Sequence, residues 1–200
     1  MIDNVFFDSK ILPIIRLGLN NETESDSKIE LSDSELEELL YFSSEQSILP
    51  IAIKGIQRLD HKYIIKKFYA DKHAKCIHQF IQQEEALKNI CSVLDKHSIK
   101  YVLLKGADIR ALYPEKELRT SCDIDILVHK DNLEEAVDII ELETDFSTNG
   151  SDYHDISMKN KYVHLELHFS IKFNSEKIDA YLDKSWDYST PAHLLRYLRI

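Results

Sequence analysis

Two aspartates separated by one residue are the side chains in this sequence best suited to chemistry. Asp123 and Asp125 lie in an apolar segment in which they alternate with Ile124, Ile126 and Val128. In a β-strand, residues i and i+2 point to the same face, so a strand here would present both carboxylates together. Such hard oxygen ligands select Mg²⁺ or Mn²⁺, and two such ions can activate an attacking hydroxyl and stabilise a leaving pyrophosphate.

A metal site of this kind generally needs a third carboxylate, and Glu166 is the strongest candidate downstream. Leu165 and Leu167 define a buried strand face. Glu166 must then point to the opposite face, where a neighbouring strand could hold it beside Asp123 and Asp125. Glu166 could bind metal or accept the proton of the attacking group, and the sequence leaves both roles open.

Two histidines beside this glutamate permit an alternative metal site. His164 and His168 would share the strand face of Glu166, and His-x-Glu-x-His ligands also suit Zn²⁺. The aspartate pair favours the Mg²⁺ interpretation over this one. Histidines on a half-exposed strand are also common as simple polar surface, and one of them could assist proton transfer.

Positive charges upstream of the aspartates could bind phosphate. A glycine in a strand-to-helix turn, as at Lys105-Gly106, lets backbone amides approach an anion, and Lys105 would add a mobile positive charge. A solvated lysine at a strand end is an equally good interpretation of Lys105. The guanidinium of Arg119 could form bidentate hydrogen bonds to a phosphate. Without a phosphate, Arg119 would form a surface ion pair with Glu115 or Glu117.

The first hundred residues carry patterns typical of helices. Ser32 and Glu35 form a capping box that predicts a helix beginning near Ser34, and Pro50 should break or kink it before a second helical stretch at 51–59. Residues 62–97 contain no Gly or Pro, and apolar side chains recur there at spacings of three and four. This stretch predicts one long helix, or two in line.

Strands and helices are expected to alternate in the second half of the chain. From the change of periodicity after residue 98 we predict, in order, a buried strand at 101–104, a helix of one or two turns at 107–112, a strand at 123–128, a helix at 133–142, and strands at 153–158 and 162–169. The last two strands would pair through the turn-prone residues 159–161.

Charge and composition restrict the partners. The chain has 35 acidic and 25 basic side chains and a net charge of −10, which repels a nucleic-acid backbone. A nucleoside triphosphate fits better, because divalent cations neutralise both its phosphates and a carboxylate cluster. Cys76, Cys91 and Cys122 match neither a disulfide framework nor a structural zinc site and are expected in the core. With no apolar run near the ~20 residues of a membrane span, we expect a cytoplasmic protein.

Together the motifs resemble the uncharacterised nucleotidyltransferase family within the DNA-polymerase-beta-like superfamily. The segments that carry the resemblance are Leu-Leu-Lys-Gly at 103–106, Tyr-Pro at 113–114, Arg119, Asp-Ile-Asp-Ile-Leu-Val at 123–128 and His-Leu-Glu-Leu-His at 164–168. In that superfamily a glycine turn precedes an Asp-x-Asp strand, and a third acid follows on a later strand. The resemblance implies that Gly106 is the turn glycine, that Asp123 and Asp125 are the metal pair, and that Glu166 is the third acid.

The resemblance also implies an α+β fold, in which a mixed β-sheet core is flanked by helices and preceded by a helical N-terminal region. We therefore predict a helical region at 1–98 and a nucleotidyltransferase-like core at 99–200, with a short or absent C-terminal helical region and a helix starting within 191–200. The sequence departs from the family pattern in two places. Ala107 follows Gly106 where the family usually has Ser or Gly, and the interval from Gly106 to Asp123 is longer than in many members.

Two functions follow from the sequence. The first is a metal-dependent transferase that moves a nucleoside monophosphate from a triphosphate such as ATP to a hydroxyl-type acceptor on a small molecule or protein. The residues assigned to metal binding and catalysis are Asp123, Asp125 and Glu166, and those assigned to phosphate binding are Lys105, Gly106 and Arg119. The alternative is a catalytically inactive protein of this fold that binds nucleotide or acts as a regulatory interaction module, an interpretation that Ala107 favours.

Overall fold

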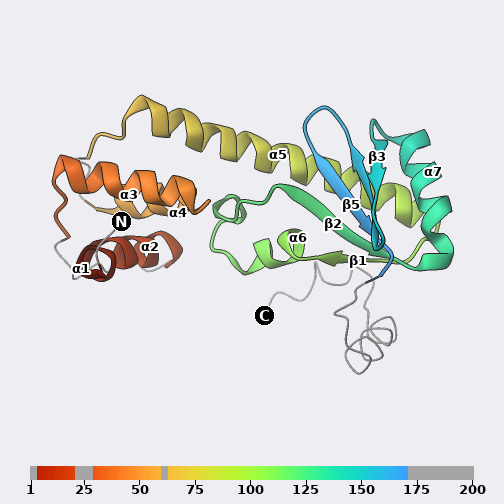
Figure 1. The fold of residues 1–200 in the computed structure, drawn as a ribbon, viewed down its shortest axis with the longest axis horizontal. Helices are drawn as coiled ribbons and strands as arrows, with labels where there is room; N and C mark the ends of the chain where they lie inside the picture. The colour runs from red at the N-terminus through yellow and green to blue at the C-terminus, as the bar shows by residue number, and fades with distance from the viewer. Residues whose placement is uncertain (1–3, 21–28, 60–62, 171–200) are drawn as a thin grey trace, which may run out of the picture. The chain divides into compact units, whose positions relative to one another are not determined.

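The computed structural model describes residues 4–20, 29–59 and 63–170, which form a helical N-terminal half and a mixed β-sheet (Figure 1). The chain divides into two compact units, Met1–Phe80 with Ile109–Thr120, and Ile81–Asp108 with Ser121–Ile200. Each unit is therefore built from two separate stretches of chain. The domain boundary predicted near residue 98 stays a prediction, because a compact unit is not by itself a domain that folds alone.

The first unit is helical. Its elements are α1 (Asn4–Phe6), the π-helical η1 (Phe7–Ile11), α2 (Leu12–Leu19), α3 (Asp33–Glu45), α4 (Leu49–Arg58), the start of α5 (Lys67–Lys96) and the short 3₁₀ turns η2 (Arg110–Leu112) and η3 (Lys116–Leu118). Buried side chains such as Ile14, Leu39 and Ile53 join η1, α2, α3, α4 and the start of α5 in one core. Helices α3 and α4 were predicted individually, whereas α1, η1 and α2 fall in a region that was predicted only as helical overall.

The predicted capping box is present at the start of α3. The hydroxyl oxygen of Ser32 accepts a hydrogen bond from the amide of Glu35, and the carboxylate of Glu35 accepts one from the amide of Ser32 at 2.7 Å. Pro50 lies in the first turn of α4, where a missing amide hydrogen costs nothing. The break between the helices therefore falls before Pro50, at residues 46–48, and Pro50 starts the second helix rather than kinking the first.

Of the two alternatives predicted from the periodicity, one long helix or two in line, the structure has the single helix α5, with 30 residues. Its first part belongs to the first unit and its second part, from Ile81, belongs to the second. Cys91 on this helix is buried in the core, as expected, and Cys76 is half-buried. The third cysteine, Cys122, is exposed, so the prediction that it is a core residue was wrong.

The second unit is built on a five-stranded sheet with the order β1-β2-β5-β4-β3. The strands are β1 (Tyr101–Leu104), β2 (Asp123–Val128), β3 (Ser147–Ser151), β4 (Asp155–Lys159) and β5 (His164–His168). Strands β2 and β5 pair in parallel, and the other neighbours pair antiparallel. The predicted α+β fold, with a mixed sheet, flanking helices and a helical N-terminal region, is thus confirmed.

Two features of the sheet differ from expectation. Strand β1 was predicted to be buried, but it forms one edge of the sheet, and only Tyr101 in it is fully buried. Strand β3 was not predicted at all, because its sequence Ser-Thr-Asn-Gly-Ser has no apolar side and all five residues are exposed. Strands β4 and β5 are joined as predicted, through a turn in which the side-chain oxygen of Asn160 accepts hydrogen bonds from the amides of Tyr162 and Val163.

The sheet has one apolar face and one polar face. Ile124, Ile126 and Leu165 on the apolar face share a buried core with side chains of α5 and of α7 (Leu133–Glu143). Because side chains alternate along a strand, the intervening residues of β2, β4 and β5 point to the other face. Those residues are mostly acids and histidines. In the part of the chain that is described, every helix is too short or too polar to cross a membrane.

Candidate active site

The predicted carboxylates meet on the polar face of β2 and β5. The parallel register places Asp125 opposite Glu166 and Asp123 opposite His164. Partners in adjacent strands project to the same face, so Asp123, Asp125 and Glu166 share one surface of the sheet. Asp125 is only 2% exposed, whereas the side chain of Glu166 is 35% exposed and Asp123 is half-buried. Solvent can therefore reach this group of acids from the side of Asp123 and Glu166.

Asp125 is the best compensated of the three acids. Its Oδ1 atom lies 2.6 Å from the ammonium nitrogen of Lys105 and 3.0 Å from Nε2 of His168. Burial acts to raise the pKa of Asp125, but the hydrogen bonds from His168 and Lys105 outweigh it, and the pKa lies below its usual value. These two donors therefore hold Asp125 as an anion.

Glu166 is in the opposite electrostatic situation. Burial and the negative charges of Asp123 and Asp125 raise its pKa above the usual value, and His168, whose Nε2 lies 3.3 Å from Oε2 of Glu166, offsets this only in part. Glu166 thus sits in a negative potential that the protein does not neutralise. A cation bound between these acids would neutralise it.

The turn after β1 places Lys105 against Asp125. Strand β1 ends at Leu104, the register partner of Asp125, and Lys105 follows with a φ of 45°, in the left-handed region that residues other than glycine rarely adopt. The side chain of Lys105 is 63% exposed, yet its ammonium reaches the buried carboxylate, which raises the pKa of Lys105. Lys105 is thus an exposed lysine at a strand end that also pairs with Asp125, and its role as a phosphate ligand stays a prediction.

Close packing against Ser121 favours a glycine at position 106. Its φ is not positive, and a Cβ atom at this position would lie 3.2 Å from the Cβ of Ser121. Gln83 on α5 fixes Ser121, since its amide nitrogen donates to the carbonyl of Ser121 at 3.1 Å. Gly106 opens α6 (Gly106–Ile109), a helix of four residues. Its predicted role as an anion-binding turn stays a prediction.

Arg119 belongs to the first unit and the aspartates to the second, so its role as a phosphate ligand also stays a prediction. Its guanidinium donates to the carbonyl of Thr120, and its own carbonyl accepts from Nε of Arg110 at 3.4 Å. Glu115, one of the two acids considered as its partner, forms an ion pair with Lys54 at 2.6 Å.

The side chains on this face fit a divalent metal ion. Single ligand atoms of Asp125, Glu166 and His168 all lie within 4.8 Å of one another. Asp123 lies on the same face but outside this group, whose two carboxylates already favour Mg²⁺ or Mn²⁺. The contact between His168 and Asp125 was not predicted, although the signal was available. In a parallel pair, the residue two positions after Glu166 also faces the strand of Asp125.

The structure separates the two histidines of the alternative zinc site predicted from His-x-Glu-x-His. His168 is 6% exposed and contacts both Asp125 and Glu166. His164 lies at the other end of β5, opposite Asp123, and is exposed. The two histidines therefore have different surroundings although they share one strand face.

Comparison with known proteins gives a family for this chain. A family model described as uncharacterised nucleotidyltransferase matches residues 32–197, which include α3, the whole described sheet and all three acids. No curated protein and no solved structure matches the chain. The match covers well over half of the sequence. The chain therefore belongs to the uncharacterised nucleotidyltransferase family.

Proposed function

We propose that this protein transfers a nucleoside monophosphate from a nucleoside triphosphate to a hydroxyl-type acceptor on a small molecule or protein. The observation that carries the proposal is the parallel register of Asp125 with Glu166, which gathers three acids on one open face of the sheet. The family supports the nucleotidyl transfer. The net charge of −10 supports a small molecule or protein as acceptor rather than nucleic acid.

The acids have the composition of a metal-binding set. Asp123, Asp125 and Glu166 would hold Mg²⁺ or Mn²⁺, which when bound neutralises the triphosphate and lowers the pKa of the attacking hydroxyl. The raised pKa of Glu166 in the metal-free protein reflects the same crowding of negative charge. Glu166 is placed either to hold the ion or to accept the proton of the acceptor hydroxyl.

Two other residues complete the site through Asp125. His168 is buried, and its Nε2 can only donate to the carboxylate oxygen of Asp125, so it fixes the orientation of that carboxylate. Lys105 is largely exposed and reaches Asp125 with the tip of a flexible side chain. We assign to Lys105 a second position in the nucleotide complex, where its ammonium would contact a phosphate oxygen.

The test compares two aspartates in the same unit. The purified full chain is incubated with each labelled nucleoside triphosphate, Mg²⁺ and fractions of small molecules and proteins, and label transfer and pyrophosphate release are measured. Asp125→Asn should lower both by at least about 100-fold. Asp138→Asn, on the exposed side of α7, should leave them unchanged. Full turnover by Asp125→Asn would exclude the proposed mechanism.

A second function, nucleotide binding without transfer, is favoured by one contact. Lys105 and His168 both donate to Oδ1 of Asp125 and would compete with a metal ion for this oxygen. A protein that keeps this arrangement when nucleotide binds would act as a sensor or regulatory module. Calorimetric titration with a triphosphate, with and without Mg²⁺, separates the two functions. Metal-dependent binding with no product for any acceptor would support the sensor.

A further inference from the structure

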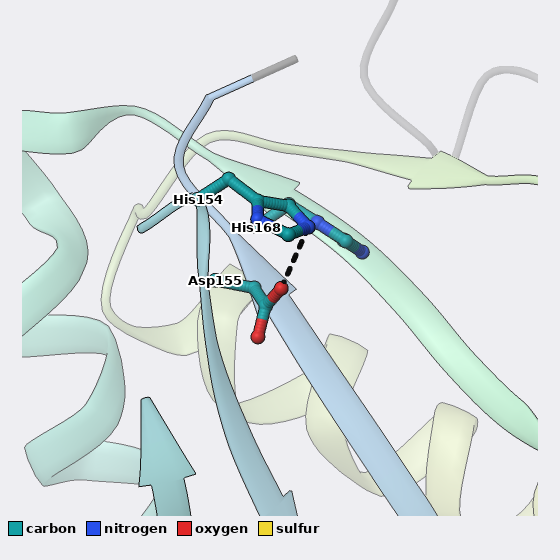
Figure 2. Close-up of side chains that lie close together, drawn as sticks. All are labelled: His154, Asp155 and His168. Carbon is teal, nitrogen blue, oxygen red and sulfur yellow. Dashed lines mark ion pairs between the residues drawn. The ribbon is translucent and has the colours of Figure 1, made fainter. Parts of the chain in front are cut away.

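A second group of metal-binding side chains lies at the C-terminal end of β5. His154, Asp155 and His168 each offer a ligand atom, and these atoms all lie within 4.8 Å of one another. Figure 2 shows the two imidazole rings beside each other with the carboxylate of Asp155 next to them, joined to His154 by an ion pair. Neither His154 nor Asp155 has a part in the transferase site.

The sheet register explains why these three residues converge. Asp155 and His168 are direct partners in the antiparallel pair of β4 and β5, so their side chains project to the same face. His154 precedes β4 in a bend closed by a hydrogen bond from the amide of Asp152 to the carbonyl of Asp155 at 2.9 Å. The bend brings the ring of His154 to 5.6 Å from that of His168, measured between centroids.

The group is enclosed on one side and open on the other. Asp155 is 8% exposed and His168 is 6% exposed, whereas the side chain of His154 is 32% exposed. Nε2 of His154 lies 2.9 Å from Oδ2 of Asp155. Its other ring nitrogen, Nδ1, is buried and has no hydrogen-bond partner among the residues that the structure describes. Such a nitrogen usually finds a partner, so its ligand capacity is available to an ion.

We propose that His154, Asp155 and His168 bind Zn²⁺, or another divalent transition metal that prefers imidazole. Two imidazoles and one carboxylate form the ligand set of zinc sites that keep a fourth position open for water. With zinc–ligand bonds of about 2.0–2.2 Å, neighbouring ligand atoms lie roughly 3.3 Å apart, so the atoms observed within 4.8 Å of one another would close by up to about 1.5 Å.

This site differs in chemical preference from the acids beside it. Nitrogen ligands favour Zn²⁺, Co²⁺ and Ni²⁺, whereas the carboxylates of Asp123, Asp125 and Glu166 favour Mg²⁺. His168 lies between the two sets, because its Nε2 donates to Asp125 at 3.0 Å, which leaves Nδ1 as the atom that would bind zinc. The polar face of the sheet would then carry two neighbouring metal sites of different selectivity. The zinc site does not depend on the proposed transferase function.

The test measures metal binding alone, so its outcome is independent of nucleotide transfer. The full chain is freed of metal with a chelator and titrated with Co²⁺, followed by visible absorption, and then with Zn²⁺ in competition. We expect one Co²⁺ per chain, displaced by one Zn²⁺. His154→Ala should weaken this binding at least 10-fold. Asp155→Asn, which keeps the size of the side chain, should do the same with an unchanged circular dichroism spectrum.

Two control variants separate this site from its neighbours. His164→Ala removes an exposed histidine from the same strand, and Asp123→Asn removes an acid of the carboxylate set. Both should retain the Co²⁺ affinity of the unmodified chain. Loss of binding in His164→Ala but not in His154→Ala would show that the metal binds the His-x-Glu-x-His residues instead and would overturn the proposal. Equal binding in His154→Ala, Asp155→Asn and the unmodified chain would also overturn it.

Discussion

Asp125 and Glu166 are direct partners on parallel strands, yet their surroundings shift their pKa values in opposite directions. His168 and Lys105 donate to Asp125 and lower its pKa despite its burial. Glu166 is partly buried and lies beside the negative charges of Asp123 and Asp125, so its pKa is raised. One acid thus stabilises the metal-free protein as an anion, and the other destabilises it.

Glu166→Gln should therefore stabilise the protein when metal is absent. A carboxyl whose native pKa lies above its unfolded value lowers stability at neutral pH, and this effect disappears as the pH falls below the unfolded value near 4.3. We expect Tm to rise by about 2 °C at pH 7, a small effect because Glu166 is partly solvated. The measurement is thermal unfolding in chelator at pH 7 and at pH 4, where the difference should vanish.

Glu85→Gln, on an exposed position of α5, is the control for this substitution. It should change the free energy of unfolding by no more than about 0.5 kcal/mol. A fall of Tm in Glu166→Gln at pH 7 would show that Glu166 makes a favourable interaction in the metal-free protein, contrary to the crowding of negative charge described above.

Asp125→Asn should have the opposite effect on stability. A carboxyl whose native pKa is lowered adds stability above its unfolded pKa, near 3.9, and loses it as the pH falls through the native value. Replacing the buried anion weakens its hydrogen bonds to Lys105 and His168, and we expect a loss of about 2 kcal/mol at pH 7. Urea unfolding in chelator measures this loss, which should shrink below pH 4. A stabilised Asp125→Asn would contradict the role of these two donors.

Most of the fold could be predicted from local patterns. The capping box of Ser32 with Glu35, the periodicity of α5 and the alternation in β2 are local signals, and each element forms where its signal lies. The side of the sheet taken by Glu166 also followed from alternation with its apolar neighbours. In each case a few adjacent residues determine the local structure.

The contacts of the site depended on pairing between distant strands, which local patterns do not contain. The parallel register that brings His168 to Asp125 joins residues 43 positions apart. His154 reaches the polar face only because of a bend, whereas regular alternation would turn it away from Asp155. Strand β3 lacks any apolar side, so only its hydrogen bonds to β4 define it. All of these features depend on the order and pairing of the strands.

The left-handed backbone of Lys105 leads to a prediction that separates conformation from charge. Lys105→Gly and Lys105→Ala both remove the ammonium that contacts Asp125, but only glycine adopts a φ of 45° without steric cost. The glycine variant should therefore be more stable than the alanine variant by about 1 kcal/mol. Urea unfolding of the two variants gives this difference directly. Equal stability would mean that the turn relaxes to another conformation when the ammonium is lost.

The helical unit depends on a close contact between α2 and α4. A Cβ atom on Gly55 would lie 2.1 Å from the carbonyl oxygen of Ile14, and one on Gly18 would lie 2.2 Å from that of Ile51. These obstacles are backbone atoms, so Gly55→Ala must push the helices apart.

We expect Gly55→Ala to lower the free energy of unfolding by at least about 3 kcal/mol. Gly150→Ala is the matched control, because nothing lies within 4 Å of a Cβ at that exposed position and its φ is not positive. It should change stability by no more than about 0.5 kcal/mol. Urea unfolding followed by circular dichroism compares the two variants. If Gly55→Ala were as stable as Gly150→Ala, α2 and α4 would not pack backbone to backbone through these glycines.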